Sequence, residues 1–313
     1  MMFQKNSCKD KKMIKIFSIS LIIICFISCS IENNGQPKSP GDKNKFNVIT
    51  VIPKSLIAKI PSEVQESSGL ILYNNLLWTF NDSGGENKLF GLNFSGEIVR
   101  IITVKNGTNV DWEDIAQDDQ YVYIGDFGNN NGDRKDLKIY KIKKSEMDSG
   151  DIVTASKIDF SYAEQKDFSS NPLNTPFDCE AITNYNGNLF IFTKNWVDET
   201  TSVYQIPKNE GDYVLSFIDT FNVNGLVTGA DISPDEKTLA LVGYKDFKPI
   251  VWLFSDITEQ NFLGGKEIYM KLDEIYSAQT EGICFKGNDT LLISNEHTST
   301  FDQQIFYIDL KNL

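Results

Sequence analysis

Acidic side chains are the residues of this sequence whose type and spacing best suit chemistry. Residues 110–130 (VDWEDIAQDDQYVYIGDFGNN) place six of them around a short apolar run: Asp111, Glu113, Asp114, Asp118, Asp119 and Asp126. Carboxylates held close together cannot all stay ionised unless backbone amides or a cation compensate their charge. The chain has 1 histidine and 5 cysteines, so the oxygen-rich ligand set favours Ca²⁺ or Mg²⁺ over zinc. The alternative is that each acid only caps a turn.

The acidic pattern recurs along the chain. Four other stretches combine an acid, small or apolar residues, a polar turn, an apolar run and a polar loop, and they begin at residues 65, 177, 228 and 280. Aligning all five stretches pairs one acid from each: Glu66, Glu113, Glu180, Asp231 and Glu281. These acids are 47, 67, 51 and 50 residues apart. Such a near-constant period indicates a repeat architecture.

Each repeat has room for about four β-strands. Runs such as KLFGLNF, LKIYKIKK and PIVWLFS alternate and are rich in β-branched and aromatic residues, and no segment shows sustained helical periodicity. Four antiparallel strands per repeat predict an all-β fold, a β-propeller. We expect five four-stranded blades, with residues 46–60 supplying the strand that closes the last blade. Six blades are the alternative, if the 67-residue interval hides a degenerate blade.

The propeller would gather the repeated acids at one place, because the first strand of every blade lines the central channel. We therefore predict a calcium site at the channel mouth, with seven candidate ligands: Glu66, Asp111, Glu113, Asp114, Asp126, Glu180 and Glu281. Loops that follow the second strands add further polar residues near this level: Asn81, Asp82, Asn129, Lys194, Lys245, Asn295 and Glu296. His297 follows Glu296 in the same loop and is the single histidine.

The N-terminus has the features of a bacterial lipoprotein signal. Lysines precede an apolar run at residues 16–27 that is too short to span a bilayer, and FISCS follows with a small residue before Cys29. We expect residues 1–28 to be the signal peptide, residues 29–45 a flexible tether and residues 46–313 the propeller. Lipidation of Cys29 would place the protein in the bacterial cell envelope. Ser30 after that cysteine favours the outer membrane.

Net charge limits the partners. Removal of residues 1–28, which carry five lysines and one aspartate, lowers the net charge from −13 to −17. Nucleic acids and anionic membrane surfaces are therefore poor partners, and membrane association would depend on the lipid anchor. Only Cys179 and Cys284 remain in the folded part, which is too few for a disulfide framework or a zinc site.

Several motifs together resemble a known family. ESSGL, WTFNDSGG, DWEDIA, YIGDFGNNNGDRKDLKIYKI, DCEAI and TEGI are similar to bacterial secreted or lipid-anchored β-propellers described as phytase-like or esterase-like and related to the SdiA-regulated family. The resemblance runs from about residue 66 to residue 296 and implies a propeller that binds calcium. In the phytases calcium lies beside a basic cluster that holds phosphate, and Arg134 and Lys194 occupy the corresponding regions. The chain has only two arginines, Arg100 and Arg134, so a rich phosphate-binding cluster is not evident.

Three functions fit these features. The first is a binding module whose acidic mouth takes a small molecule, glycan or protein. The second is a metal-dependent hydrolase of phosphoesters or esters, in which Glu113, Asp114 and Glu180 hold the ion while the substrate is bound by Arg134, Lys194, Glu296 or His297. The third is a glycan-active enzyme with paired carboxylates and the aromatic residues Trp112, Trp196 and Phe127 for stacking on sugars. The sequence leaves open whether the protein is an enzyme, and we favour the first function.

Overall fold

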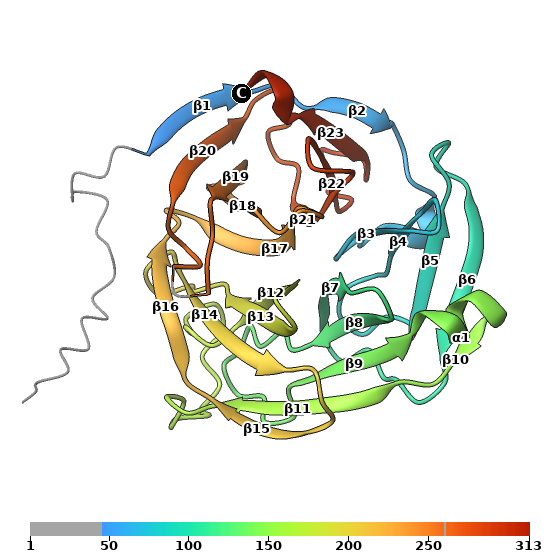
Figure 1. Ribbon diagram of the computed structural model, residues 1–313, viewed down its shortest axis with the longest axis vertical. Helices are drawn as coiled ribbons and strands as arrows, with labels where there is room; N and C mark the ends of the chain where they lie inside the picture. The colour runs from blue at the N-terminus through green and yellow to red at the C-terminus, as the bar shows by residue number, and fades with distance from the viewer. Residues whose placement is uncertain (1–45, 260) are drawn as a thin grey trace, which may run out of the picture. The chain divides into compact units, whose positions relative to one another are not determined.

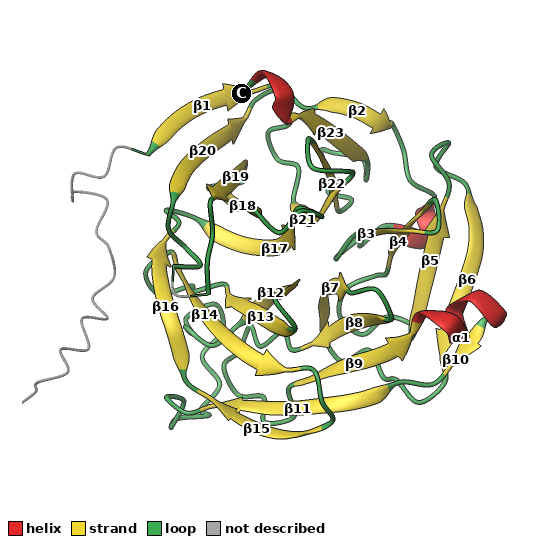
Figure 2. Ribbon diagram, viewed as in Figure 1, coloured by secondary structure: helices red, strands yellow, loops and turns green. Residues whose placement is uncertain are grey.

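The computed structural model describes residues 46–259 and 261–313, and these residues form five small β-sheets arranged in a ring (Figure 1, Figure 2). The prediction of an all-β, five-bladed propeller is confirmed. Each sheet begins at the central channel with the first strand of its repeat and continues outward. The first blade consists of β3 (Ile71–Tyr73), β4 (Leu76–Thr79), β5 (Lys88–Leu92) and β6 (Ile98–Val104). The second consists of β7 (Trp112–Gln117), β8 (Tyr121–Asp126), β9 (Lys138–Lys143) and β11 (Ser156–Tyr162).

The remaining three blades repeat this order. The third consists of β12 (Cys179–Tyr185), β13 (Asn188–Thr193), β14 (Thr200–Pro207) and β16 (Phe217–Asn222). The fourth consists of β17 (Leu226–Ile232), β18 (Thr238–Lys245), β19 (Lys248–Ser255) and β20 (Lys266–Leu272). The fifth consists of β21 (Thr280–Phe285), β22 (Thr290–Asn295), β23 (Ile305–Asp309) and β2 (Lys54–Ile57).

The N-terminal segment closes the ring, as the sequence predicts. Strand β2 pairs antiparallel with β23, with Lys54 opposite Tyr307 and Ser55 opposite Phe306. The preceding strand, β1 (Asn47–Val51), pairs in parallel with β20 at the outer edge of the fourth blade. The segment thus connects the last two blades, and each of its strands covers an edge that would otherwise be exposed.

The long interval between the second and third repeats contains no sixth blade within the described part of the chain. It holds the helix α1 (Lys144–Ser149), the short strand β10 (Ile152–Val153) and a loop over residues 163–178. Strand β10 pairs in parallel with β6 of the first blade, and β15 (Gly211–Leu215) pairs in parallel with β11 of the second. Two 3₁₀ turns, η1 (Ser62–Val64) and η2 (Leu310–Asn312), complete the elements. No helix in the described segments is both long and apolar enough to cross a membrane.

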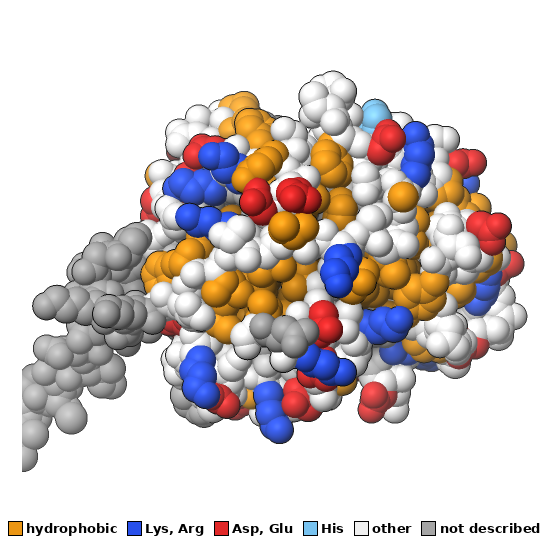
Figure 3. All heavy atoms as spheres, turned by 90° about the horizontal axis from the view of Figure 1, so that it is seen from above, with side chains coloured by type: hydrophobic (Ala, Val, Ile, Leu, Met, Phe, Trp, Pro, Cys, Tyr) orange, Lys and Arg blue, Asp and Glu red, His pale blue; other side chains and the backbone are white. Residues whose placement is uncertain are grey.

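Aromatic side chains fill the space between blades. Trp112 contacts Phe80 of the first blade edge-on, with 5.4 Å between ring centroids, and Tyr140 of its own blade at 5.9 Å. Trp112 and Phe127 are both 0% exposed. The expectation that these two residues could stack on a sugar is therefore wrong, because the contact between blades buries them. On the outer side of the ring, charged residues of both signs mix with apolar ones (Figure 3).

Candidate functional site at the channel mouth

Irregular strand pairing places acidic side chains at the mouth. In four blades the innermost strand has a register shift where it begins, between Trp112 and Ile115, Cys179 and Ala181, Val227 and Gly229, and Thr280 and Ile283. A bulge redirects the side chain of its extra residue. The residues at these shifts include Glu113, Glu180, Thr228 and Glu281. Three of the repeated acids therefore lie at equivalent positions, whereas a threonine holds the equivalent position in the fourth blade.

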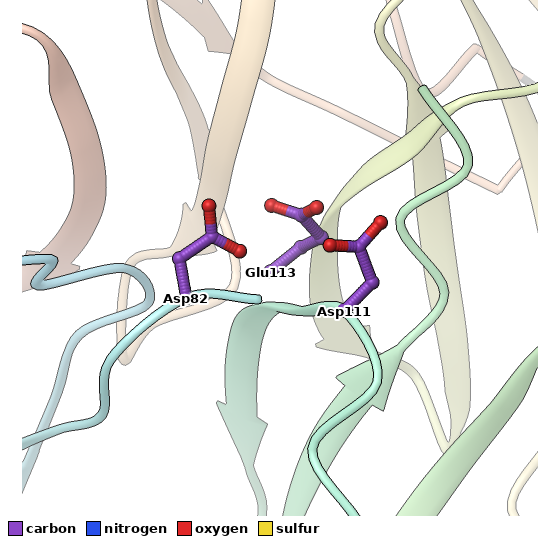
Figure 4. A group of neighbouring side chains, drawn as sticks. All are labelled: Asp82, Asp111 and Glu113. Carbon is purple, nitrogen blue, oxygen red and sulfur yellow. The ribbon is translucent and has the colours of Figure 1, made fainter. Parts of the chain in front are cut away.

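Asp82, Asp111 and Glu113 form one group, which we call the carboxylate triad. Asp82 lies in the loop after β4 of the first blade, Asp111 directly precedes β7 of the second, and Glu113 lies in the β7 bulge. One oxygen from each carboxylate can be chosen so that all three lie within 4.8 Å of one another. The three carboxylates gather around a common space in Figure 4. The triad thus joins two blades that are adjacent in the ring.

Asn109 holds together the two loops that carry the triad. Its side-chain nitrogen donates to the backbone oxygens of Asn81 at 2.8 Å and Asp82 at 3.0 Å. Its side-chain oxygen accepts from the backbone nitrogen of Trp112 at 3.1 Å. On the other side, the Asp126 carboxylate accepts from the backbone nitrogen of Asp111 at 3.2 Å. The backbone oxygen of Glu113 accepts from the backbone nitrogen of Gly69 at 3.0 Å, so hydrogen bonds to the backbone hold all three acids in position.

Glu113 has no partner of its own. Its side chain is buried with 4% of its surface exposed, yet no described residue donates a hydrogen bond to its carboxylate or forms an ion pair with it. Burial raises the pKa of Glu113 well above its usual value, and the neighbouring charges of Asp82 and Glu180 raise it further. Burial, followed by the charge of Glu281, raises the pKa of Asp82 to about 7. Burial, followed by the charge of Asp82, likewise raises the pKa of Asp111 to about 7.

Gly128 makes room for the triad. A Cβ atom at this position would lie 2.0 Å from Oε1 of Glu113 and 2.4 Å from Oδ2 of Asp111. The φ angle of Gly128 is outside the left-handed region, so backbone conformation does not require glycine here. Glycine is required because the two carboxylates occupy the space that a side chain would need. Any larger residue would have to push the carboxylate oxygens away.

Lys194 neutralises a second group of acids at the mouth. Its ammonium lies 3.2 Å from the Glu180 carboxylate and faces the rings of Trp196 at 4.9 Å and Tyr244 at 5.4 Å. Only 5% of the lysine is exposed. Burial alone would lower the pKa of Lys194, but Glu180 and other acids raise it well above its usual value. We call Lys194 with Glu180, Asp178 and Glu281 the lysine quadrant, since their charges interact directly.

Besides Glu180, two of the predicted ligands already have partners in the fold. Asp126 pairs with Arg134 at 2.9 Å and with Lys138 at 3.7 Å. Asp114 is 0% exposed, and its two carboxylate oxygens accept from the backbone nitrogens of Ile115, Ile182 and Ala230 at 2.8, 2.9 and 3.1 Å. Asp114 therefore links three blades near the axis. These bonds reach into the third and fourth blades, so Asp114 does more than cap a turn of its own blade.

The predicted substrate-binding residues differ in their availability. Arg134 donates to Asp126, to Asp136 and to the backbone oxygen of Gly128, so its guanidinium is engaged within its own loop. Glu296 accepts from the Gln279 side chain at 2.7 Å, and burial followed by the charge of Glu281 raises its pKa to about 9. The His297 ring is half exposed and lies 3.6 Å from Asp302.

The two remaining acids of the repeat alignment, Glu66 and Asp231, belong neither to the carboxylate triad nor to the lysine quadrant. Glu66 is exposed beside the mouth, where its backbone contacts Asn81. Asp231 lies near the far end of β17, where it accepts from the backbone nitrogen of Phe285 at 2.7 Å. The alignment matched acid to acid, whereas the strand pairing matches Thr228 with the other acids. The lipidation candidate Cys29 lies outside the described residues.

The sequence prediction missed two residues that shape the site. Asp178 accepts from the backbone nitrogen of Asn129 at 2.5 Å and from the indole nitrogen of Trp196 at 2.7 Å. It precedes Cys179 and Glu180 as Asp111 precedes Trp112 and Glu113, so a comparison of DCE with DWE could have identified it. Asn109 carries no comparable signal, because its contacts are with a loop 27 and 28 residues away.

Comparisons with known proteins identify no family. No family model matches the sequence, and no curated protein matches it. A provisionally assigned TolB of Agrobacterium tumefaciens has 11% identity and a TM-score of 0.42, with 78% of this chain and 77% of that chain covered. A provisionally assigned exported protein of Bacteroides fragilis has 10% identity and a TM-score of 0.43, with 85% and 99% covered. A glucose dehydrogenase has 8% identity and a TM-score of 0.46, with 82% and 99% covered. The fold assignment rests on the strand pairing of this chain.

Proposed function

We propose that this protein is a lipid-anchored propeller of the bacterial cell envelope that holds Ca²⁺ at the carboxylate triad and binds its ligand there. The observation that carries the proposal is the side chain of Glu113, which is 4% exposed and lies beside two other acids without a cation or hydrogen-bond donor among the described residues. A buried charge without a partner is costly. A cation between the three carboxylates would remove that cost.

The ligand chemistry of the triad suits calcium. Ca²⁺ takes six to eight oxygen ligands and tolerates irregular geometry. Three carboxylates from the protein would leave coordination positions for water and for oxygens of a bound molecule.

Anchoring is proposed on the sequence alone. The short apolar run, its basic flank and the motif FISCS support lipidation of Cys29. The tether of residues 29–45 would then join the lipid to β1, which begins at Asn47. Metabolic labelling with a fatty acid tests this, since Cys29→Ala should abolish incorporation and move the protein from the membrane fraction to the soluble fraction. Labelling that persists in the variant would contradict it.

Hydrolysis of a phosphoester has weaker support than binding. Both basic residues that could hold a phosphate are engaged, Arg134 with Asp126 and Asp136, and Lys194 with Glu180. A phosphate bound between them would meet several carboxylates of the same sign. We therefore propose a binding module.

Calcium titration of the chelator-treated full-length protein tests the proposal. Calorimetry should give one binding event, and the melting temperature should rise with calcium, because a ligand at one hundred times Kd stabilises the folded state by about 2.7 kcal/mol. Glu113→Gln keeps the shape of the side chain and should remove most of both responses. Glu66→Gln, at an exposed acid beside the same mouth, is the matched control and should respond like the parent. If the parent shows neither heat nor a melting shift, no cation binds at the triad.

A further inference from the structure

The N-terminal segment enters the propeller at the outer side of the fourth blade. Phe46, the first described residue, packs against Trp252 at 5.0 Å and Tyr269 at 6.3 Å between ring centroids. Strand β1 then runs along β20 at the outer edge of that blade. The tether of residues 29–45 spans at most about 60 Å when fully extended. A lipid on Cys29 would therefore keep the fourth blade within that distance of a bilayer.

Strand β1 presents apolar side chains to solvent. Alternate residues point to opposite sides of a strand. Ile49 and Val51 pack against the core. Val48 is exposed, and so is Ile52, which directly follows the strand. Thr50, between these two, lines a hollow of about 600 Å³. Val48 and Ile52 therefore flank that hollow.

Two exposed aromatic side chains also border the hollow. Tyr276 lines it, and Phe247 lies in the turn between β18 and β19, whose flanking residues Asp246 and Lys248 line it. Phe247 is 71% exposed, and no aromatic side chain in the described ranges is more exposed. The backbone nitrogen of Ser277 donates to the backbone oxygen of Phe247 at 3.0 Å, which joins the two loops. We give the name fourth-blade patch to four exposed side chains: Val48, Ile52, Phe247 and Tyr276.

The turn that carries Phe247 is unusual for its sequence. Asp246 and Phe247 have φ angles of 50° and 59°, in the left-handed region that disfavours residues with a Cβ atom. The hairpin turns at residues 74–75 and 186–187 have the same geometry, and they use the asparagine and glycine that suit it. Phe247 thus occupies an unfavourable backbone position without being buried in the core. This combination points to a contact outside the chain.

The charges beside the fourth-blade patch are of both signs. Lys248 and Lys271 form no ion pair with any residue in the described ranges, and Asp246 and Asp273 lie beside them around the hollow. Zwitterionic phospholipid headgroups offer phosphate and ammonium groups side by side, so they can pair with both signs. Exposed aromatic and apolar side chains next to lysines are typical of surfaces that lie in the headgroup layer of a bilayer.

We propose that the fourth-blade patch is the surface with which the propeller rests on a phospholipid bilayer. The inference rests on the proposed lipid anchor and deepens it by naming the face that is turned to the membrane. Phe247 and Tyr276 enter the headgroup layer, and Val48 and Ile52 lie beside them. The contact needs little affinity of its own, because a tethered surface meets the bilayer at a high effective concentration.

Quenching of tryptophan fluorescence by brominated lipid tests the proposal. The chain from residue 29 onward is coupled through the Cys29 thiol to a maleimide phospholipid in phosphatidylcholine vesicles, since Cys179 and Cys284 are buried. Coupling makes the outcome independent of whether cells lipidate the protein. In Phe247→Trp, the added emission should fall by about half when the lipid is brominated, because an interfacial side chain lies about 5–10 Å into the boundary between headgroups and acyl chains. Tyr276→Trp is a second reporter in case the first variant does not fold.

Val214→Trp is the matched control. Val214 is 74% exposed, like Phe247, but it lies in β15 at the outer edge of the second blade, on the opposite side of the ring from β1 (Figure 1). Its added emission should be the same with both lipids. Equal quenching of the control and the reporters would overturn the proposal. Reporters that are not quenched would also overturn it and would favour a protein partner for the patch.

Discussion

The carboxylate triad and the lysine quadrant lie at the same channel mouth, and they differ in whether the chain supplies a cation. In the lysine quadrant, the Lys194 ammonium lies 3.2 Å from Glu180 and is enclosed by two aromatic rings. In the triad, Glu113 is equally buried but has no cation or hydrogen-bond donor among the described residues. In the lysine quadrant the chain itself supplies the cation that compensates the clustered acids. In the triad, the proposed calcium ion would take that part.

Removing the internal cation should have the largest effect. Breaking one partner of a buried ion pair typically costs about 3–5 kcal/mol, because the other charge stays buried. Lys194→Met should therefore lower the free energy of unfolding by about that amount in urea denaturation with chelator present. The double variant Lys194→Met/Glu180→Gln should recover part of the loss.

The same variant can sharpen the comparison. If Lys194 takes the place of a bound metal ion, its removal should allow calcium to bind in the lysine quadrant. Calorimetry should then give two bound ions per protein in place of one. A variant that is as stable as the parent, or that still binds a single ion, would show that the two regions do not differ as described.

The pH dependence of stability should differ with and without calcium. The pKa values of Asp82 and Asp111 are raised to about 7 in the folded state, above their unfolded values near 4. Folding therefore favours their protonated forms, and the melting temperature in chelator should fall as the pH rises from about 4 to about 7. Calcium binds the ionised forms, so its stabilising effect should grow over the same range. The difference between the two curves reports the triad together with the acids whose charges act on it, Glu180 and Glu281. Parallel curves would contradict the account.

A smaller effect is expected from Gly128→Ala. The added methyl group would lie within 2.4 Å of oxygens of Glu113 and Asp111 and should displace them, which should weaken calcium binding about tenfold. Gly150→Ala is the matched control, because a Cβ atom there has no neighbour within 4 Å. Equal calcium affinities of the two variants, measured by calorimetry, would show that the triad geometry does not set affinity.

Much of the fold could be predicted because repetition is visible in the sequence. Period, turn residues and alternating strands predict five blades and closure by residues 46–60, within which residues 54–57 form the closing strand. The position of each acid was harder to predict, since it depends on bulges that leave no clear sequence signal. Thr228 occupies the position expected for Asp231. The Asp114 carboxylate accepts hydrogen bonds from the backbone nitrogens of two residues that are 68 and 116 positions further along the chain. Contacts at such separations cannot be read from local pattern.

The most direct test of the central claim is a crystal structure of the full-length protein soaked in calcium chloride, with anomalous differences measured at long wavelength. The account predicts one peak between the carboxylates of Asp82, Asp111 and Glu113 and none beside Lys194. A map without a peak at the triad, with calcium present in excess, would contradict it.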